Sequence, residues 1–170
     1  KNLSYIIAYP EAEGIFNPQY PFGAKLNKKR IGAIPIGQSL DYNKINIVLN
    51  NLLGVPYKWG GKTSLGFDCS GLVQSVLNVY GIKIPRDSKN QWRFLEPYKI
   101  NIEQAKKGDL HFFGRKGEVS HVGFACGGYD FIHSQGYVKK ESLDQNDPNF
   151  NKSLLDIYLS SASIRLKFKL

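Results

Sequence analysis

Cys69 is the residue of this sequence best placed to act as a nucleophile. It follows Asp68, a residue type that caps helices, and it precedes apolar residues that recur at steps of three and four over 72–80. Gly81 stands where a left-handed glycine commonly ends a helix. We therefore expect Cys69 in the first turn of a helix, where backbone N–H groups and the helix dipole favour a thiolate. The sequence predicts a lowered thiol pKa and a nucleophilic sulfur.

Two of the three histidines lie on one predicted β-hairpin and supply a candidate base. His121 and His133 occupy short strand patterns on either side of Cys126-Gly127-Gly128. For both imidazoles to face one cleft, odd-numbered residues must pair with odd. This favours a three-residue loop with His121 opposite His133, and a bulge would have the same effect. A histidine beside Cys69 would take its proton, and a second polar group would orient that histidine.

Structural roles are the alternatives for these residues. The glycines and polar residues around Cys69 indicate an open loop rather than a core cysteine. A zinc site of Cys69, Cys126, His121 and His133 lacks the paired short spacing of zinc ligands and is not expected. Acyl transfer to a thiolate requires neither a metal nor a cofactor. Cys126 ends an apolar strand and is interpreted as an inert core or turn residue. His111, within a strand pattern, is interpreted as structural.

The elements that must position these residues change in kind along the chain. Helical patterns cover 41–53, 69–80 and a short stretch after Asp87-Ser88. Strand patterns then follow at 110–113, 120–125, 129–134, 137–138 and 157–170, the last of them alternating over 164–168. Helices first and an antiparallel sheet afterwards predict an α+β fold for residues 41–170.

Residues 1–40 differ from the rest of the chain in their sequence pattern. Short strand patterns at 3–9 and 31–36 flank a stretch that Pro10, Gly14, Pro18, Pro21 and Gly23 interrupt repeatedly. Forty residues are too few for an independent domain. We interpret them as a β-rich arm that packs on the rest of the chain.

Composition narrows the class of protein. The chain has 170 residues, ten Tyr, ten Phe and a formal charge of +9. Its cations are scattered, with short runs only at 28–30 and 139–140, so nucleic-acid binding is not expected. A diffuse positive charge suits a polymer that carries carboxylates or phosphates. No run is long and apolar enough to span a membrane, and the chain begins at Lys1 without any Met, so we expect a processed or trimmed form.

Several short motifs together carry a family resemblance. They occur in this order: Tyr57-x-Trp59-Gly60-Gly61, Asp68-Cys69-Ser70-Gly71-Leu72-Val73, Pro85-Arg86-Asp87-Ser88 with Gln91, Gly108-Asp109-Leu110 with Phe112-Phe113, His121-Val122-Gly123, and Ile132-His133-Ser134. The chain resembles, over roughly 41–170, the NlpC-type cysteine peptidases, papain-like enzymes that cut the peptide stems of bacterial cell wall. The resemblance implies Cys69 as nucleophile, His121 as base, His133 as the orienting residue and Tyr57 as a donor to the oxyanion.

The resemblance also implies a substrate. The bond expected to be cut joins γ-D-glutamate to L-lysine or diaminopimelate, in stem peptides or muropeptides. One branch of the family requires a free N-terminal L-alanine, and Asp68, Ser70, Asp87 and Ser88 match its substrate-binding positions. Asp68, Asp87 and Ser88 are also good cap sites, so simple capping is the alternative. Trp59 is interpreted as a core aromatic, and Gly60 and Gly61 as residues that allow a tight backbone approach beneath the substrate.

Other interpretations stay open from the sequence. Residues 1–40 are alternatively a shortened Src-homology-3-type barrel, and without a complete barrel the enzyme is alternatively an endopeptidase on intact wall. An amidase or acyltransferase would use the same catalytic residues. A non-catalytic wall-binding module would lack the nucleophile or the base, and both are present. We expect a monomer in the bacterial cell envelope with its signal peptide removed, the alternative being a cytoplasmic wall-recycling enzyme.

Overall fold

The computed structural model of the protein describes residues 3–8, 19–38 and 40–170. The α-helices are α1 (Ile45–Asn51), α2 (Cys69–Val79), α3 (Ser88–Phe94), α4 (Lys152–Leu155) and α5 (Ile164–Phe168). Short 3-10 helices occupy Tyr42–Lys44, Glu96–Tyr98 and Ile102–Gln104. The strands are β1 (Tyr5–Ile7), β2 (Lys25–Leu26), β3 (Ala33–Pro35), β4 (Lys62–Thr63), β5 (Gly66–Phe67), β6 (Lys99–Ile100), β7 (Leu110–Arg115), β8 (Glu118–Gly127), β9 (Asp130–Gln135), β10 (Tyr137–Ser142) and β11 (Tyr158–Ala162).

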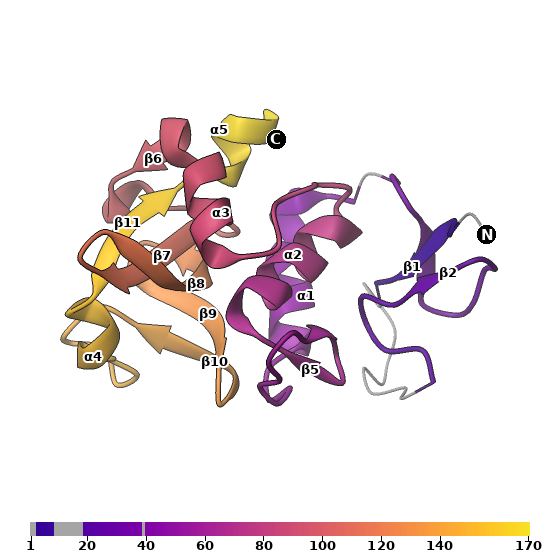
Figure 1. Ribbon diagram of the computed structural model, residues 1–170, viewed down its shortest axis with the longest axis horizontal. Coiled ribbons are helices and arrows are strands. Elements are labelled where there is room, and N and C mark those ends of the chain that lie inside the picture. The colour runs from indigo at the N-terminus through magenta and orange to yellow at the C-terminus, as the bar shows by residue number, and fades with distance from the viewer. Residues whose placement is uncertain (1–2, 9–18, 39) are drawn as a thin grey trace.

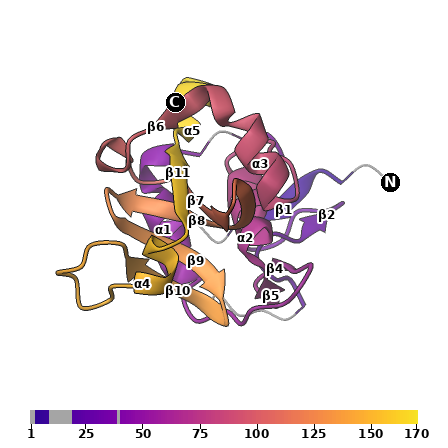
Figure 2. The same cartoon turned by 60° about the vertical axis from the view of Figure 1, so that its left-hand side comes forward.

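An antiparallel sheet of six strands, in the order β10-β9-β8-β7-β11-β6, forms one side of the molecule. Helices α1 and α2 lie between this sheet and the small N-terminal sheet of β2, β1 and β3 (Figure 1). The turned view keeps both helices on the same face of the large sheet (Figure 2). Helices α1, α2 and α3 precede the large antiparallel sheet in the chain, so the α+β prediction is confirmed.

Helix α2 begins and ends where the sequence predicts. The Asp68 side chain caps it by accepting a hydrogen bond from Gly71 N at 2.6 Å. Its last turn is closed by Gly81, whose φ of +74° is in the left-handed region that glycine adopts easily. The apolar face, including Leu72, Val76 and Leu77, is buried in the main core. Burial of this face therefore holds the start of the helix, with Cys69 in it, against the sheet.

The hairpin of β8 and β9 differs from the predicted loop. Ala125 pairs with Phe131 and Gly127 with Asp130, so Cys126 is an extra residue in β8. The three-residue loop with His121 opposite His133 is therefore wrong, and the bulge named as its alternative is correct. The bulge makes odd residues pair with odd within the strands, which places both imidazoles on one face. Continuing this register places Gly123 opposite His133, and the imidazoles are diagonal neighbours.

The C-terminal segment is only partly a strand. Residues Tyr158–Ala162 pair with β7 and β6, as expected, but the alternating stretch Ile164–Phe168 forms helix α5. Ser163 caps this helix, because its Oγ accepts from Leu166 N at 3.3 Å. The buried carboxylate of Asp109 accepts bonds from Ser163 Oγ and Ile164 N, both at 3.0 Å. These caps satisfy N–H groups that a continued strand would give to a neighbouring strand.

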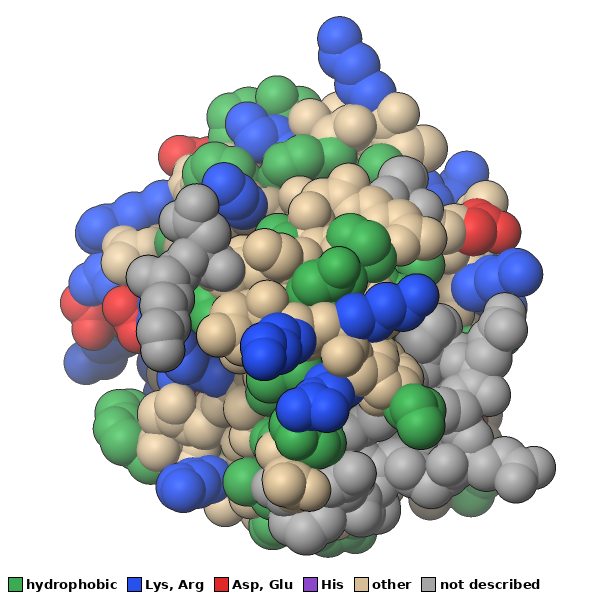
Figure 3. All heavy atoms as spheres, turned by 90° about the vertical axis from the view of Figure 1, so that its right-hand side faces the viewer, with side chains coloured by type: hydrophobic (Ala, Val, Ile, Leu, Met, Phe, Trp, Pro, Cys, Tyr) green, Lys and Arg blue, Asp and Glu red, His purple; other side chains and the backbone are tan. Residues whose placement is uncertain are grey.

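The described part of the N-terminal segment shares the main core. Ile6, Ile7 and Phe22 are buried in the same cluster as α2. Phe22 N donates to Ser64 Oγ at 2.9 Å, and the Phe22 ring meets Phe67 edge to face. The space-filling view of this side shows several Lys and Arg side chains among hydrophobic ones (Figure 3). The predicted breaks at Pro10, Gly14 and Pro18 lie outside the described residues.

Candidate active site

A cleft of about 900 Å³ lies where the start of α2 meets the large sheet. Most of the residues singled out from the sequence line it: Tyr57, Trp59, Asp68, Cys69, Ser70, Asp87, Ser88 and His121. His133 does not line the cleft, because its side chain is fully buried behind His121. These residues come from four separate segments of the chain and meet at one concave surface.

Cys69 is half-buried in the first turn of α2. Burial raises the pKa of its thiol, and the backbone N–H groups of Val122 and Ser70 only partly oppose that effect. The predicted lowering of this pKa is therefore wrong. A helix N-terminus stabilises a thiolate, but here the loss of hydration outweighs it. The approach of Val122 N–H also shows that the sulfur lies beside β8, one residue after His121.

The two histidines form a hydrogen-bonded line that ends on a carboxylate. His121 Nε2 lies 2.7 Å from His133 Nδ1, and His133 Nε2 lies 2.8 Å from Glu141 Oε2. Burial lowers the pKa of both imidazoles, so both are neutral at neutral pH. The other nitrogen of His121, Nδ1, takes no part in these two hydrogen bonds. It is therefore the nitrogen that can accept a proton from a group in the cleft.

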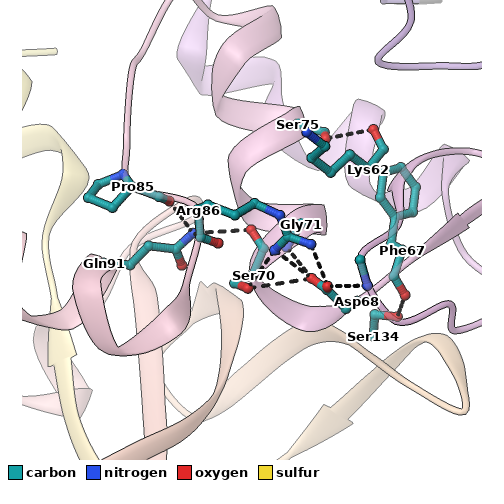
Figure 4. A network of polar contacts seen from close by, with 11 residues as sticks. Lys62, Phe67, Asp68, Ser70, Gly71, Ser75, Pro85, Arg86, Gln91 and Ser134 are labelled. Atoms are coloured by element: carbon teal, nitrogen blue, oxygen red, sulfur yellow. Dashed lines mark hydrogen bonds and ion pairs between the residues drawn. The ribbon is translucent and has the colours of Figure 1, made fainter.

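The carboxylate of Asp68 forms its hydrogen bonds with other residues of the protein. It accepts from Arg86 Nη1 at 2.9 Å and from Arg86 Nη2 at 2.5 Å (Figure 4). Gly60 N also donates to it, at 2.9 Å. Burial acts against ionisation, but the Arg86 hydrogen bond and the backbone donors leave the pKa of Asp68 below its usual value. Together with the Gly71 bond, these contacts fill most of the acceptor positions of the carboxylate. Asp68 therefore is the helix cap that the alternative interpretation predicts.

Ser70 and Gln91 tie the Pro85-Arg86 loop to the start of α2. Ser70 Oγ lies 3.0 Å from Arg86 Nη1, and Gln91 Nε2 donates to Pro85 O at 2.9 Å and to Ser70 O at 3.1 Å (Figure 4). The Ser70 side chain reaches the cleft but is largely buried. The guanidinium of Arg86 is thus fixed in the cleft wall.

Asp87 and Ser88 differ from Asp68 in being more exposed to the cleft. Asp87 stands at the cap position of α3, yet its side chain makes no capping hydrogen bond. Its carboxylate is exposed in the cleft, with Ser88 beside it. The capping alternative is therefore wrong for the Asp87 side chain, which is free to meet a ligand.

Two aromatic residues line the cleft near Cys69. Burial, followed by the charges of Cys69 and Asp68, raises the pKa of the Tyr57 hydroxyl. Trp59 is 87% exposed, so its interpretation as a core aromatic is wrong. The loop that contains Trp59 packs against its neighbours through glycines, and the Trp59 indole does not contribute to that packing.

The glycines of this loop allow a close approach to α2. A Cβ on Gly71 would collide with the carbonyl oxygen of Gly61, and a Cβ on Gly61 would collide with Gly66. The tight approach predicted for Gly60 and Gly61 is therefore found at Gly61 only, and its close neighbours are Gly66 and Gly71 of α2; a Cβ on Gly60 would meet nothing within 4 Å. Gly60 has a φ of +74° and donates its N–H to Asp68.

His111 and Cys126 lie away from the cleft. The His111 ring is fully buried, with Nδ1 2.7 Å from Ser161 Oγ and Nε2 2.9 Å from Gly128 O. Burial lowers its pKa to about 4. Burial likewise raises the pKa of Cys126 to about 11. Within the described residues, no group of three or more His, Cys, Asp and Glu side chains is arranged to hold a metal ion.

The comparison with known protein families agrees with this geometry. The model of the NlpC/P60 family matches residues 54–157, which include Cys69, His121 and His133. The chain belongs to the NlpC/P60 family.

Relatives within the NlpC/P60 family are known as enzymes and as structures. The chain is 33% identical over 160 residues to a gamma-D-glutamyl-L-lysine dipeptidyl-peptidase of Bacillus subtilis (strain 168), which covers 89% of this chain and 53% of that protein. It is similar to the crystal structure of an NlpC/P60 family protein from Bacillus cereus ATCC 10987 (TM-score 0.63, 31% identity, 74% of this chain and 41% of that one). It is also similar to the NlpC/p60 domain of the peptidoglycan hydrolase SagA (TM-score 0.59, 32% identity, 74% of this chain and 100% of that one). The chain spans about half or less of the curated relatives' length.

Two residues of this NlpC/P60 site were missed by sequence reasoning. Glu141 and Arg86 lie in the cleft wall or directly behind it, and each makes charged hydrogen bonds to a predicted residue. Arg86 belongs to the Pro85-Arg86-Asp87-Ser88 motif, and its charge within that motif was the available signal. Glu141 gave no signal, because only the pairing of β9 with β10 brings it to His133.

Proposed function

We propose that this protein is a cysteine peptidase that hydrolyses the γ-D-glutamyl–diamino acid bond of peptidoglycan stem peptides. The observation that carries the proposal is the meeting of Cys69 and His121 at one cleft, with His121 held by a buried His133. The relatives named as dipeptidyl-peptidases and peptidoglycan hydrolases support the same reaction class. No cofactor takes part in this chemistry.

The proposed reaction is acyl transfer through a thioester. Cys69 Sγ attacks the scissile carbonyl carbon as its proton passes to His121 Nδ1, and that proton then goes to the leaving amine. Water, deprotonated by His121, attacks the thioester and releases the acid and the thiol. Because the thiol pKa is raised and the imidazole pKa is lowered, the resting pair is neutral, and the proton moves as the substrate reacts.

The negative charge that develops on the substrate oxygen needs donors. Cys69 N–H stands in the first turn of α2, where helices leave N–H groups without partners inside the helix. Tyr57 lines the same cleft as Cys69. These two groups are the proposed oxyanion donors.

Charges in the cleft suit the ends of a stem peptide. Asp87, with Ser88, is proposed to bind the free ammonium of an N-terminal L-alanine, since an ammonium that leaves water needs carboxylate or hydroxyl partners. Arg86 and Lys89 also line the cleft and suit the carboxylates of the stem. Asp68 and Ser70 act on the substrate indirectly in this proposal, by fixing Arg86.

The proposed partners are stem peptides or muropeptides, and the proposed place of action is the bacterial cell envelope. The net charge of +9 favours approach to an acidic wall. Among the helices of the described residues, none has the length and apolar character needed to cross a membrane. We propose a monomer, with the N-terminal segment acting as an arm on the catalytic domain of residues 41–170.

Product analysis by mass spectrometry tests the proposal. The protein is incubated with L-Ala-γ-D-Glu-L-Lys, with the diaminopimelate analogue, with their N-acetylated forms and with intact wall. We expect release of L-Ala-γ-D-Glu from the free-amine peptides and none with Cys69→Ala. Cleavage at another bond, or cleavage that survives in Cys69→Ala, would overturn the proposal. Equal cleavage of acetylated peptides would support an endopeptidase on intact wall instead.

A further inference from the structure

Glu141 ends the line of imidazoles behind Cys69 and is the candidate for a further role. Its carboxylate is 17% exposed and receives three side chains from different positions. His133 Nε2 lies 2.8 Å and Asn151 Nδ2 2.7 Å from Oε2, while Lys139 Nζ lies 3.0 Å from Oε1. Three partners on one carboxylate fix its position and keep it ionised.

We propose that Glu141 is a positioning residue that sets the tautomers of His133 and His121. An ionised carboxylate only accepts hydrogen bonds, so His133 must carry its proton on Nε2. The neutral ring then has a lone pair on Nδ1, which accepts from His121 Nε2–H at 2.7 Å. His121 is left with its lone pair on Nδ1, the nitrogen assigned to the Cys69 proton. The inference rests on the proposed function only for that last step.

The surroundings of His133 favour the tautomer that is protonated on Nε2. The His133 side chain is fully buried, and Gly123 lies directly against its Cβ, since a Cβ added to Gly123 would be 2.9 Å from that atom. Each nitrogen of the buried ring therefore depends on a protein partner for its hydrogen bond, His121 at Nδ1 and Glu141 at Nε2. Lowering of the Glu141 pKa, by His133, Asn151 and Lys139 against the effect of burial, keeps the carboxylate ionised near neutral pH.

Asn151 links this carboxylate to the wall of the cleft. Its Nδ2 donates to Glu141, and its Oδ1 accepts from Leu154 N at 2.9 Å at the start of α4. Leu154 and Ile157 line the cleft. The proposed positioning carboxylate is thus held by a residue whose own segment lines the cleft.

Two substitutions of Glu141 distinguish its role as a hydrogen-bond acceptor from the effect of its negative charge. In Glu141→Gln the amide oxygen can take the place of Oε2 and still accept from His133 and Asn151, although the charge is lost. In Glu141→Ala the buried Nε2–H has no acceptor, so His133 is free to move its proton to Nδ1. His133 Nδ1–H would then donate to His121 Nε2, so His121 would change tautomer as well and carry its proton on Nδ1.

Long-range proton–nitrogen NMR spectra of the imidazoles near pH 7.5 test the proposal without using activity. We expect protonated Nε2 and bare Nδ1 on His133 and His121 in the wild type and in Glu141→Gln, and a shift toward protonated Nδ1 in Glu141→Ala. His111, which donates from Nε2 to Gly128 O, is an internal control that should not change. Lys140→Met, on the same strand but paired with Asp130, should match the wild type.

Kinetics add the second measurement. Glu141→Ala should lower kcat by roughly a hundredfold with little change in KM, and Glu141→Gln should recover most of that loss. A His133 protonated on Nδ1 in the wild type would overturn the proposal, even if no Ala variant folds. Unchanged tautomers and kcat in a folded Glu141→Ala would overturn it too. A wild type that cuts no stem peptide would defeat the proposed function while leaving the tautomer result standing.

Discussion

The guanidinium of Arg86 holds both carboxylate oxygens of Asp68, through bonds of 2.9 and 2.5 Å. This pair fixes one wall of the cleft and uses the charge of Asp68 inside the protein. Asp87, the next residue after Arg86, keeps an exposed carboxylate with no capping bond. The two acidic residues that the sequence treated alike therefore have different tasks, one structural and one open to a ligand.

Matched substitutions of the two acidic residues should separate these tasks. Asp87→Asn should reduce kcat/KM for the free-amine peptide by on the order of a hundredfold and leave the melting temperature unchanged, because only a substrate contact is lost. Asp68→Asn should lower the free energy of unfolding by about 2–4 kcal/mol, since it leaves Arg86 without its partner. Denaturant unfolding and peptide kinetics measure both. Similar melting temperatures for both variants would contradict the assignment.

The proposed catalytic pair is tested by substitution and by alkylation. Cys69→Ala and His121→Ala should each abolish stem cleavage while the near-UV circular dichroism stays native. Iodoacetamide should modify Cys69 faster than Cys126 near neutral pH, because Cys69 lies in the cleft beside a base and burial raises the Cys126 pKa to about 11. The Cys69 rate should fall in His121→Ala. Equal labelling of the two thiols in the wild type would count against the pair.

Gly71→Ala should damage the site through the backbone. The added methyl group would collide with Gly61 O and lie 2.8 Å from Asp68 Oδ1, which forces the Tyr57–Gly61 loop away from α2. We expect a loss of about 1–3 kcal/mol in the free energy of unfolding, despite the higher helix propensity of Ala, and weaker stem cleavage. Asn78→Ala, on a less buried position of the same helix, is the matched control and should be nearly neutral. Equal stability of the two variants would show that the loop yields without cost.

Stability should decrease as the pH falls below about 6.5, the usual pKa of histidine. His111 stays neutral in the folded protein down to about pH 4, whereas the unfolded chain takes up the proton earlier. Between those values the unfolded state binds more protons, so acid favours unfolding, by an amount on the order of 3 kcal/mol for this residue. The carboxylates of Asp68 and Glu141, whose pKa values are lowered, add a loss only at lower pH.

Urea unfolding at pH 7.5 and pH 5.0 measures that effect. His111→Gln, which keeps a donor for Gly128 O but does not titrate, should show a smaller difference between the two midpoints than the wild type. Part of the difference should remain, because His121 and His133 are also buried in neutral form. An identical difference in the variant and the wild type would exclude His111 as a source.

The sequence by itself determined the features that depend on neighbouring residues. Asp68 before an apolar helical pattern fixed the start of α2 and hence the place of Cys69, because capping and periodic burial act over a few residues. The requirement that His121 and His133 share a face predicted odd-with-odd pairing, since side chains alternate along a strand. The motifs then placed the chain in its family.

Only the tertiary structure decided the features that depend on distant partners. Helix α5 replaces an alternating strand pattern because Asp109, more than fifty residues earlier, accepts from Ser163 and Ile164. The thiol pKa rises because packing of α2 on the sheet removes water from Cys69, an effect that no local sequence pattern reveals. Glu141 reaches His133 through strand pairing, and Arg86 neutralises Asp68 across eighteen positions. Charge and hydration at the site are set by contacts between segments, so they appear only when the segments are assembled.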